Sequence, residues 1–346
     1  MIPSLLYDPE FISALPQLDK YHNPFIVSLC KTDIPWLVDL RNHLDRWYSE
    51  TKTEDKPIIY ASLRSSNDMH FQSVLYELVF RQYGLQRKWQ VVRNPIIGGK
   101  TPDYNMTIPN GPSFFLEVTV KEPDQERKYS RNRYETLLRR LDTIRTPYQF
   151  SVHMQAPIST CLNYDVVKEY VARGFTELIY HDNEDYEIDL APVGITGDIQ
   201  IRGKKEEASD DNVIAWGETV DLSDTPKDVA NAIRRKVKKY GIIKATGNPY
   251  VVAVCAIDED AIDMALYGKT VISFNVNNPN SEAKVRRDFS GLVTPKPRLF
   301  SPLNRRLSAV ISCNWKDMPN GSCGFRLKVA PLPAKRDQFQ AVTRAG

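Results

Sequence analysis

The alternation of apolar and polar residues predicts a β-hairpin in the middle of the chain. Residues 113–121 alternate with a period of two, as do residues 103–108, which is typical of strands with one apolar face. A three-residue loop at 109–111, ending in a left-handed glycine, keeps the two polar faces together, whereas a two-residue Asn-Gly turn would mix them. The register set by the three-residue loop places Asp103 opposite Glu117.

Two carboxylates that face each other across a hairpin suggest a metal site. Directly opposed residues have Cβ atoms about 4.5–5.5 Å apart, and like charges at that distance repel each other. A divalent cation between Asp103 and Glu117 would relieve this repulsion. The alternative is a solvated hairpin with acidic residues on its wet face, and the pair alone leaves both interpretations open.

A second pattern predicts a buried helix before the hairpin. Asn67 or Asp68 can cap its start, and Gly84 is placed to end it. Apolar residues cover the helix on nearly all sides. Within residues 71–80, Glu77 is the only charged residue. A buried glutamate needs a metal or a partner. The alternative to a metal is an ion pair at the rim of the helix with a nearby arginine, such as Arg81 four residues along.

A third pattern predicts a helix over residues 226–240 with a lysine on its inner face. At helical spacing, Lys236 falls in the middle of an apolar stripe. That stripe consists of Val229, Ile233, Val237 and Tyr240. A lysine facing the core must reach a carboxylate or ligand oxygen, or else extend along its stem to solvent, and both readings stay open. The apolar run at 249–257 that follows is typical of a strand buried on both faces of an α/β sheet.

The remaining patterns divide the chain into a core with a long insertion. Other predicted elements are helices at 34–50, 131–145, 164–178 and 258–267, strands at 89–93, 149–154 and 307–313, and a basic loop at 284–306. We therefore expect an N-terminal helical cap (1–62), the first part of the core (63–123), an insertion (124–225), the second part of the core (226–315) and a peripheral C-terminal tail (316–346).

Composition adds limits on compartment and partners. The chain has 346 residues, 42% of them hydrophobic and 26% charged, with a net charge of +3. The number of cysteines is odd and they lack zinc-ligand spacing, which predicts a reducing compartment. The sequence shows no basic leader and no apolar run of about 18 residues. We therefore expect a cytoplasmic protein that does not bind membranes. Basic residues concentrate at 127–145, 234–239 and 284–306, which favours nucleic acid as the partner, although any solvated surface shows such patches.

The order of these elements resembles that of the PD-(D/E)XK nuclease superfamily. The resemblance covers roughly 65–121 and 226–257 and is carried by Glu77, the Pro102-Asp103 pair and Glu117. The spacing Lys236-x-x-x-Tyr240 resembles the Gln-x-x-x-Tyr helix motif of the recombination-nuclease branch, with lysine in place of glutamine. This likeness implies an α/β, restriction-endonuclease-like mixed central sheet flanked by helices, with a large α+β insertion and an N-terminal helical cap.

The resemblance also implies an activity and a site. Asp103 and Glu117 would hold Mg²⁺ or Mn²⁺, and Glu77 would be a further direct or water-mediated ligand. Thr119 stands where the superfamily has its lysine, so we expect Lys236 to replace it. Lys121 is the alternative, on the strand face of Glu117 and about 6.6 Å further along.

The expected function is that of a metal-dependent nuclease acting on DNA, with RNA as the alternative substrate, and a role in restriction or anti-phage defence is expected from the fold class alone. A catalytically inactive nucleic-acid-binding module is the main alternative: Thr119 favours it, and the intact carboxylates oppose it. A hydrolase of another phosphoester is a third class. A homodimer, or a protein partner in a larger complex, is compatible with each of these functions.

Overall fold

The computed structural model describes residues 5–120, 125–156, 158–178, 186–204, 213–218, 226–255, 265, 269–273, 284–289, 307–317 and 323–331. The chain forms two compact units. The first comprises residues 1–18, 23–122 and 223–346, and the second comprises 19–22 and 123–222. The second unit overlaps the insertion predicted at 124–225.

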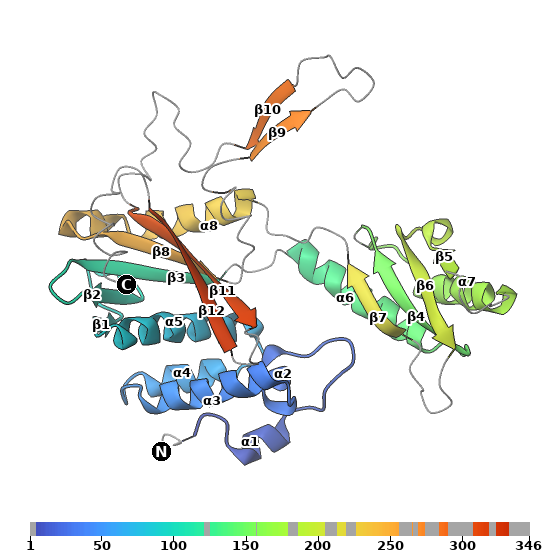
Figure 1. Ribbon diagram of the computed structural model, residues 1–346, viewed down its shortest axis with the longest axis horizontal. Coiled ribbons are helices and arrows are strands. Elements are labelled where there is room, and N and C mark those ends of the chain that lie inside the picture. The colour runs from blue at the N-terminus through green and yellow to red at the C-terminus, as the bar shows by residue number, and fades with distance from the viewer. Residues whose placement is uncertain are drawn as a thin grey trace. The chain divides into compact units, whose positions relative to one another are not determined.

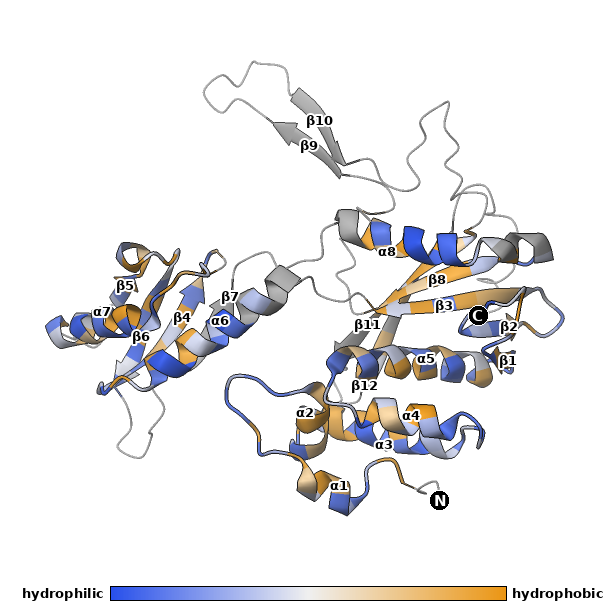
Figure 2. Cartoon of the chain, turned by 180° about the vertical axis from the view of Figure 1, so that it is seen from behind, coloured by the Kyte–Doolittle hydropathy of each residue, from blue (hydrophilic) through white to orange (hydrophobic). Residues whose placement is uncertain are grey.

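A mixed sheet of six strands is the framework of the first unit, which is therefore an α/β structure (Figure 1). In spatial order its strands are β1 (Gln90–Arg93), β2 (Tyr104–Thr107), β3 (Ser113–Val120), β8 (Tyr250–Cys255), β11 (Ala309–Asp317) and β12 (Cys323–Pro331). The three central strands β3, β8 and β11 run parallel, and the outer strands pair antiparallel. Every residue of β8 is buried, as its continuous apolar run predicts, and both β3 and β8 are largely hydrophobic in Figure 2.

Helices cover both faces of this sheet. On one face α5 (Asp68–Gln86) packs over Leu116 and Val251, and on the other α8 (Pro226–Lys239) packs over Phe115 and Val252. The N-terminal helices on the α5 side are α1 (Pro9–Ala14), α2 (Phe25–Lys31), α3 (Pro35–Ser49) and α4 (Lys56–Leu63). The sequence predicted only the one that became α3. The other three span 6, 7 and 8 residues, too few turns for a periodic pattern to stand out.

Helix α5 starts where the sequence predicted but ends later. The side chain of Asn67 caps it by accepting from the backbone N–H of Met69 at 3.0 Å. Gly84, the predicted stop, lies inside the helix, which continues to Gln86. A Cβ on Gly84 would lie 2.9 Å from Val91 Cγ2, so the glycine permits close contact between the helix and β1 rather than ending the helix.

The hairpin register is confirmed. Tyr104 pairs with Leu116 and Thr107 with Ser113, as a three-residue loop requires. The left-handed residue is different from the predicted one: Asn110 has a φ of 56°, whereas no positive φ occurs at Gly111. Asparagine tolerates this conformation better than most residues that carry a Cβ, so the dipeptide still supplies the turn.

The C-terminal third departs from the sequence prediction. The stretch after residue 316, expected to be a peripheral tail, contributes β12, which pairs along its whole length with β11 at the sheet edge. The expected loop at 284–306 contains β10 (Lys284–Phe289), which pairs with β9 (Lys269–Ser273). Strands β10 and β12 both mix basic with apolar residues, so neither shows a clear strand pattern in the sequence. The helix predicted at 258–267 lies outside the described residues, apart from residue 265.

The second unit is α+β, with its own core. Its sheet has the order β5 (Tyr186–Asp189), β6 (Gly197–Lys204), β4 (Tyr148–Met154) and β7 (Val213–Glu218), and its helices are α6 (Gln125–Asp142) and α7 (Tyr164–Glu177). Leu137, Phe150 and Val171 lie in this core. The N-terminal segment 19–22 joins the unit through ion pairs, such as Arg139 Nη2 to Asp19 Oδ1 at 2.8 Å. In the part of the chain that the structure describes, no helix is long and apolar enough to span a membrane.

Candidate active site

Glu117 lies at the centre of the candidate site. It occupies the middle of β3, between β2 and β8, and only 1% of its surface is exposed. It pairs in register with Val252 and follows the same strand face as Phe115, so its side chain points to the α8 face of the sheet. A carboxylate removed from water in this way requires charged or hydrogen-bonding partners.

Lys236 supplies the first partner. Its Nζ lies 2.6 Å from Glu117 Oε1, a charge-assisted hydrogen bond. The apolar residues of the predicted stripe on α8 are all buried, which turns Lys236 toward the sheet. The prediction that this lysine faces inward is confirmed. Its side chain remains 27% exposed, so the ammonium group sits at the boundary between core and solvent.

The second oxygen of Glu117 is unsatisfied. Oε2 is buried and has no hydrogen-bond partner among the described residues. Leaving a buried charged oxygen unpaired costs free energy, so an atom of this kind marks a place where an ion or another polar group can bind.

Asp103 is the acidic neighbour of Glu117 across the hairpin. The hairpin register, continued by one residue from the Tyr104–Leu116 pair, brings Asp103 opposite Glu117. Its Oδ2 accepts the backbone N–H of Val118 at 2.7 Å, which fixes the carboxyl group. Burial and the nearby charges of Glu117 and Glu77 raise the pKa of Asp103 to about 8. Two carboxyl groups therefore share one poorly solvated space, and the charge of Glu117 favours the neutral form of Asp103.

Two tyrosines hold α8 in place over the site. The hydroxyl of Tyr240 donates to Thr101 O at 2.9 Å, and the hydroxyl of Tyr250 donates to Lys236 O at 3.4 Å. The two rings are in contact, with centroids 6.0 Å apart. Burial first, and then the charges of Glu117 and Asp103, raise the pKa of Tyr240, so its hydroxyl stays protonated as a donor. Tyr250 was not predicted as a site residue, because at the start of a continuous apolar run it has the pattern of an ordinary core residue.

Glu77 belongs to a different network. Its Oε2 accepts from Arg93 Nη2 at 2.9 Å, and Arg93 Nη1 also contacts Asp55 Oδ1 at 3.0 Å. The partner is therefore an arginine, as in the ion-pair alternative, but it is Arg93 of β1 rather than Arg81. Arg81 instead donates to the backbone oxygen of Glu50 at 3.0 Å. Glu77 as a metal ligand stays a prediction.

Thr119 occupies the position where the family resemblance would imply a lysine. Thr119 pairs with Val254, so it shares the strand face of Glu117, and its side chain is half-buried. A threonine there places no positive charge beside the carboxylates, and Lys236 provides one from the helix above. The other candidate, Lys121, lies outside the described residues.

The donor set fits a magnesium or manganese ion. Within the described ranges there is no cluster of three or more histidine, cysteine, aspartate or glutamate side chains that could hold a metal. Mg²⁺ does not need such a cluster, because it retains several waters and is commonly bound through one or two carboxylates plus substrate phosphates. The unpaired Oε2 of Glu117 and the carboxylate of Asp103 are suitable hard oxygen ligands.

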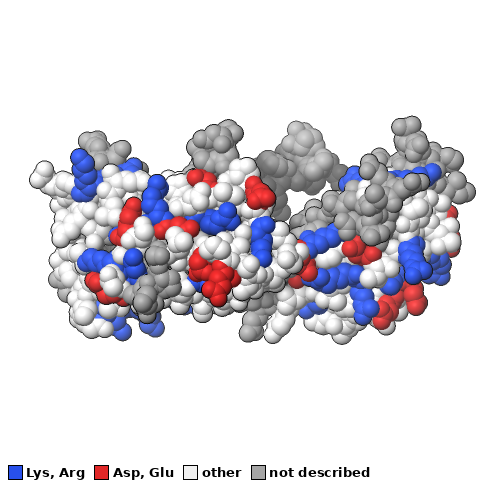
Figure 3. Space-filling model, turned by 90° about the horizontal axis from the view of Figure 1, so that it is seen from below, with Lys and Arg blue, Asp and Glu red and all other residues white. Residues whose placement is uncertain are grey.

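Charge is unevenly distributed over the described surface. On the outer side of α8, Arg235, Lys238 and Lys239 are exposed. Elsewhere basic and acidic side chains are interspersed, as on the face seen in Figure 3, so charge alone does not select a partner there.

Comparisons with protein-family models, with curated proteins and with solved structures found no match for this chain. The geometry of the site is therefore the basis on which a function can be inferred.

Proposed function

We propose that the chain is a metal-dependent nuclease with a restriction-endonuclease-like fold of the PD-(D/E)XK type. It hydrolyses phosphodiester bonds of nucleic acid, DNA rather than RNA. The observation that carries this proposal is the unpaired, buried oxygen of Glu117 beside Asp103, whose pKa is raised to about 8. Such a pair of carboxylates is costly without a cation, and strongly perturbed groups of this kind are frequent at functional sites.

Each residue has a role in this proposal. Asp103 and Glu117 would hold Mg²⁺ or Mn²⁺, which when bound would polarise the phosphate and lower the pKa of a water. Lys236 Nζ provides a positive charge that stabilises the negative charge developing on the phosphate oxygens. The hydroxyl of Tyr240 restrains the helix that carries this lysine. The exposed basic residues of α8 bind backbone phosphates without regard to sequence.

Two measurements test the proposal. Calorimetric titration with Mg²⁺ and Mn²⁺ should show binding to the wild type, and Glu117→Gln and Asp103→Asn should each abolish it. The control is Glu169→Gln, an exposed glutamate of α7 in the other unit, which should bind as the wild type does. Purified protein with either metal should cleave at least one of linear, circular or single-stranded DNA, and RNA serves as the comparison substrate.

A non-catalytic nucleic-acid-binding module is the second candidate. The Lys236–Glu117 ion pair favours it, since a lysine can neutralise the carboxylate without a metal. This alternative predicts nucleic-acid binding without measurable metal affinity or cleavage. A role in restriction or anti-phage defence, and a cytoplasmic location in which the cysteines stay reduced, accord with the nuclease proposal.

A further inference from the structure

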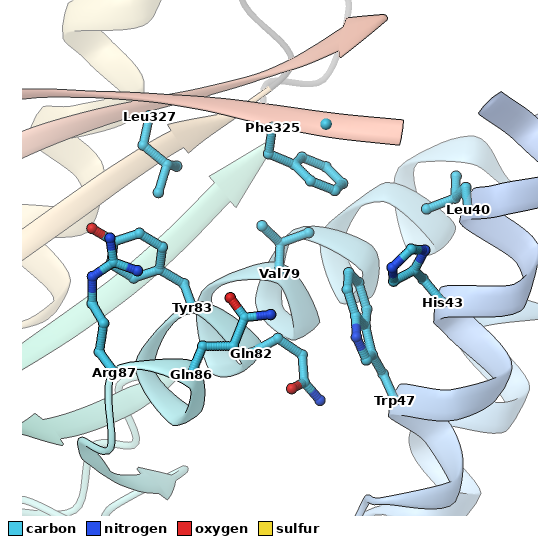
Figure 4. A pocket seen from close by; sticks show the side chains of 11 residues that line it. Leu40, His43, Trp47, Val79, Gln82, Tyr83, Gln86, Arg87, Phe325 and Leu327 are labelled. Atoms are coloured by element: carbon cyan, nitrogen blue, oxygen red, sulfur yellow. The ribbon is translucent and has the colours of Figure 1, made fainter. Parts of the chain in front are cut away.

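A cavity of about 460 Å³ opens on the α5 side of the central sheet (Figure 4). Its walls come from α3, α5 and the edge strand β12. Glu117 and Lys236 lie on the α8 side, so this cavity is separate from the candidate active site. The volume falls within the range of about 300–1,000 Å³ that is typical of small-molecule sites.

Aromatic rings form much of the wall. Trp47 extends from α3, Tyr83 from α5 and Phe325 from β12, and all three border the same space in Figure 4. The edge of Tyr83 is fixed by Trp89, with ring centroids 5.7 Å apart at 80°. Rings held at fixed angles offer faces and edges on which a planar ligand can stack.

The charged side chains that line the cavity are basic. No aspartate or glutamate is among the lining residues, whereas Arg87 stands at the rim with its guanidinium 3.7 Å from the centroid of Tyr83. The Nε of Arg87 is buried and has no hydrogen-bond partner among the described residues. A stacked guanidinium with an unused donor is suited to a carboxylate or a phosphate, which it can bind through two hydrogen bonds.

Imidazole and amide side chains complete the lining. His43 Nδ1 donates to the backbone oxygen of Asp39 at 2.8 Å, which fixes the ring and leaves Nε2 for a ligand. Gln82 Nε2 donates to Glu50 Oε2 at 3.0 Å, so its carbonyl oxygen remains available as an acceptor. Gln86 extends its amide between Arg87 and Val79 in Figure 4. Amide and imidazole groups of this kind can both donate to and accept from the edge of a heterocycle.

We propose that this cavity binds a nucleoside monophosphate. The base would stack against the aromatic wall, the polar edge of the base would meet Gln86 and His43, and the phosphate would pair with Arg87. The site is independent of the nuclease activity proposed above, because none of its lining residues belongs to the Asp103–Glu117–Lys236 cluster. A ligand here would contact α5, the helix that also carries Glu77.

Calorimetric titration of the full chain with AMP, GMP, CMP and UMP tests this proposal. We expect at least one nucleotide to bind, with adenosine, guanosine and inorganic phosphate binding more weakly. Arg87→Met, which keeps the aliphatic stem over Tyr83, should lower nucleotide affinity by about 10- to 100-fold. Gln86→Ala should lower it less and should change the preference among the bases.

Matched variants keep the result interpretable. Arg46→Met removes an exposed arginine of α3 that does not line the cavity and should leave affinity unchanged. Circular dichroism should show that each variant is folded. The proposal is overturned if no nucleotide binds at millimolar concentration, if inorganic phosphate binds as tightly as the nucleotides, or if Arg87→Met binds as the wild type does. Binding that is lost in Glu117→Gln but kept in Arg87→Met would place the nucleotide in the active site instead and would also overturn it.

Discussion

The carboxylates on the two faces of the central sheet differ in how fully they are paired. On the α5 face Glu77 is matched to Arg93, which also contacts Asp55. On the α8 face Glu117 has one oxygen on Lys236 and the other without a partner. Strands β1 and β3 of one sheet thus contribute to a satisfied network and an unsatisfied one, respectively. A satisfied buried ion pair serves the fold, whereas an unsatisfied one is the arrangement expected of a binding site.

The protonation of the two networks differs accordingly. Burial lowers the pKa of Arg93, but the hydrogen bond and charge of Glu77 outweigh this effect and raise it, so the arginine stays charged. Asp103 has no comparable compensation: burial and the charge of Glu117 raise its pKa to about 8, and the proximity of Lys236 lowers it only in part. On the α8 face the single ammonium group of Lys236 therefore does not fully offset the two carboxyl groups, and a divalent cation would supply further positive charge.

The largest expected effect concerns the unsatisfied carboxylates. Asp103→Ala or Glu117→Ala should abolish cleavage in a single-turnover assay, while nucleic-acid affinity falls little, since basic surfaces provide most of that affinity. Filter binding in the absence of metal measures the second quantity. Cleavage that persists in both variants would show that the nuclease site lies elsewhere.

The next effect concerns the lysine that replaces the motif residue. Lys236→Ala should lower the single-turnover rate at saturating protein by about 100- to 1,000-fold, because its contact strengthens as charge develops in the transition state. Lys238→Ala, on the exposed side of the same helix, should instead weaken binding and reduce its salt dependence. Lys121→Ala should do less than Lys236→Ala. A wild-type rate in Lys236→Ala with an inactive Lys121→Ala would assign the role to the strand lysine.

A third variant tests whether the α5 face is only structural. Glu77→Gln should lower the free energy of unfolding by about 1–3 kcal/mol, since Arg93 loses one of its two carboxylate partners in a largely buried position. Urea unfolding monitored by circular dichroism measures this change, with Glu169→Gln as the exposed control. Metal affinity should stay within a few-fold of the wild type. Complete loss of metal binding in a folded Glu77→Gln protein would make Glu77 a ligand and would remove the distinction between the two faces.

The smallest expected effect is a pH-dependent gain in stability. The pKa of Asp103 is about 8 in the folded chain, above the value of about 3.9 expected when unfolded. Its contribution to stability is therefore fully present below the unfolded pKa and is lost as pH rises toward 8. Asp103→Asn keeps an acceptor for Val118 N–H but cannot ionise, so its Tm without metal should exceed that of the wild type by at least about 2 °C near neutral pH.

The difference in Tm should shrink under acidic conditions, and Mg²⁺ should raise the Tm of the wild type alone. Scanning calorimetry across this pH range makes the comparison. Equal Tm values at every pH would mean that Asp103 carries no uncompensated charge, and the contrast between the two faces would then be wrong for this residue.

The sequence by itself determined the features that depend on local periodicity. Alternation and loop length set the β2–β3 register, which brings Asp103 opposite Glu117, since a slip of one residue would turn every side chain to the other face. Helical spacing turned Lys236 inward for the same kind of reason. These inferences needed only the positions of side chains along one or two adjacent elements.

Tertiary structure decided which groups meet across larger distances in the chain. Glu77 and Arg81 have the spacing of a helical ion pair, yet Glu77 pairs with Arg93, because packing α5 on the sheet brings β1 within reach. Pairing with β11 likewise makes a strand of the stretch that forms β12, since hydrogen bonds from a neighbour stabilise a sequence with a weak pattern of its own. Periodicity specifies the direction of a side chain, whereas its partner depends on the packing of elements that are distant in sequence.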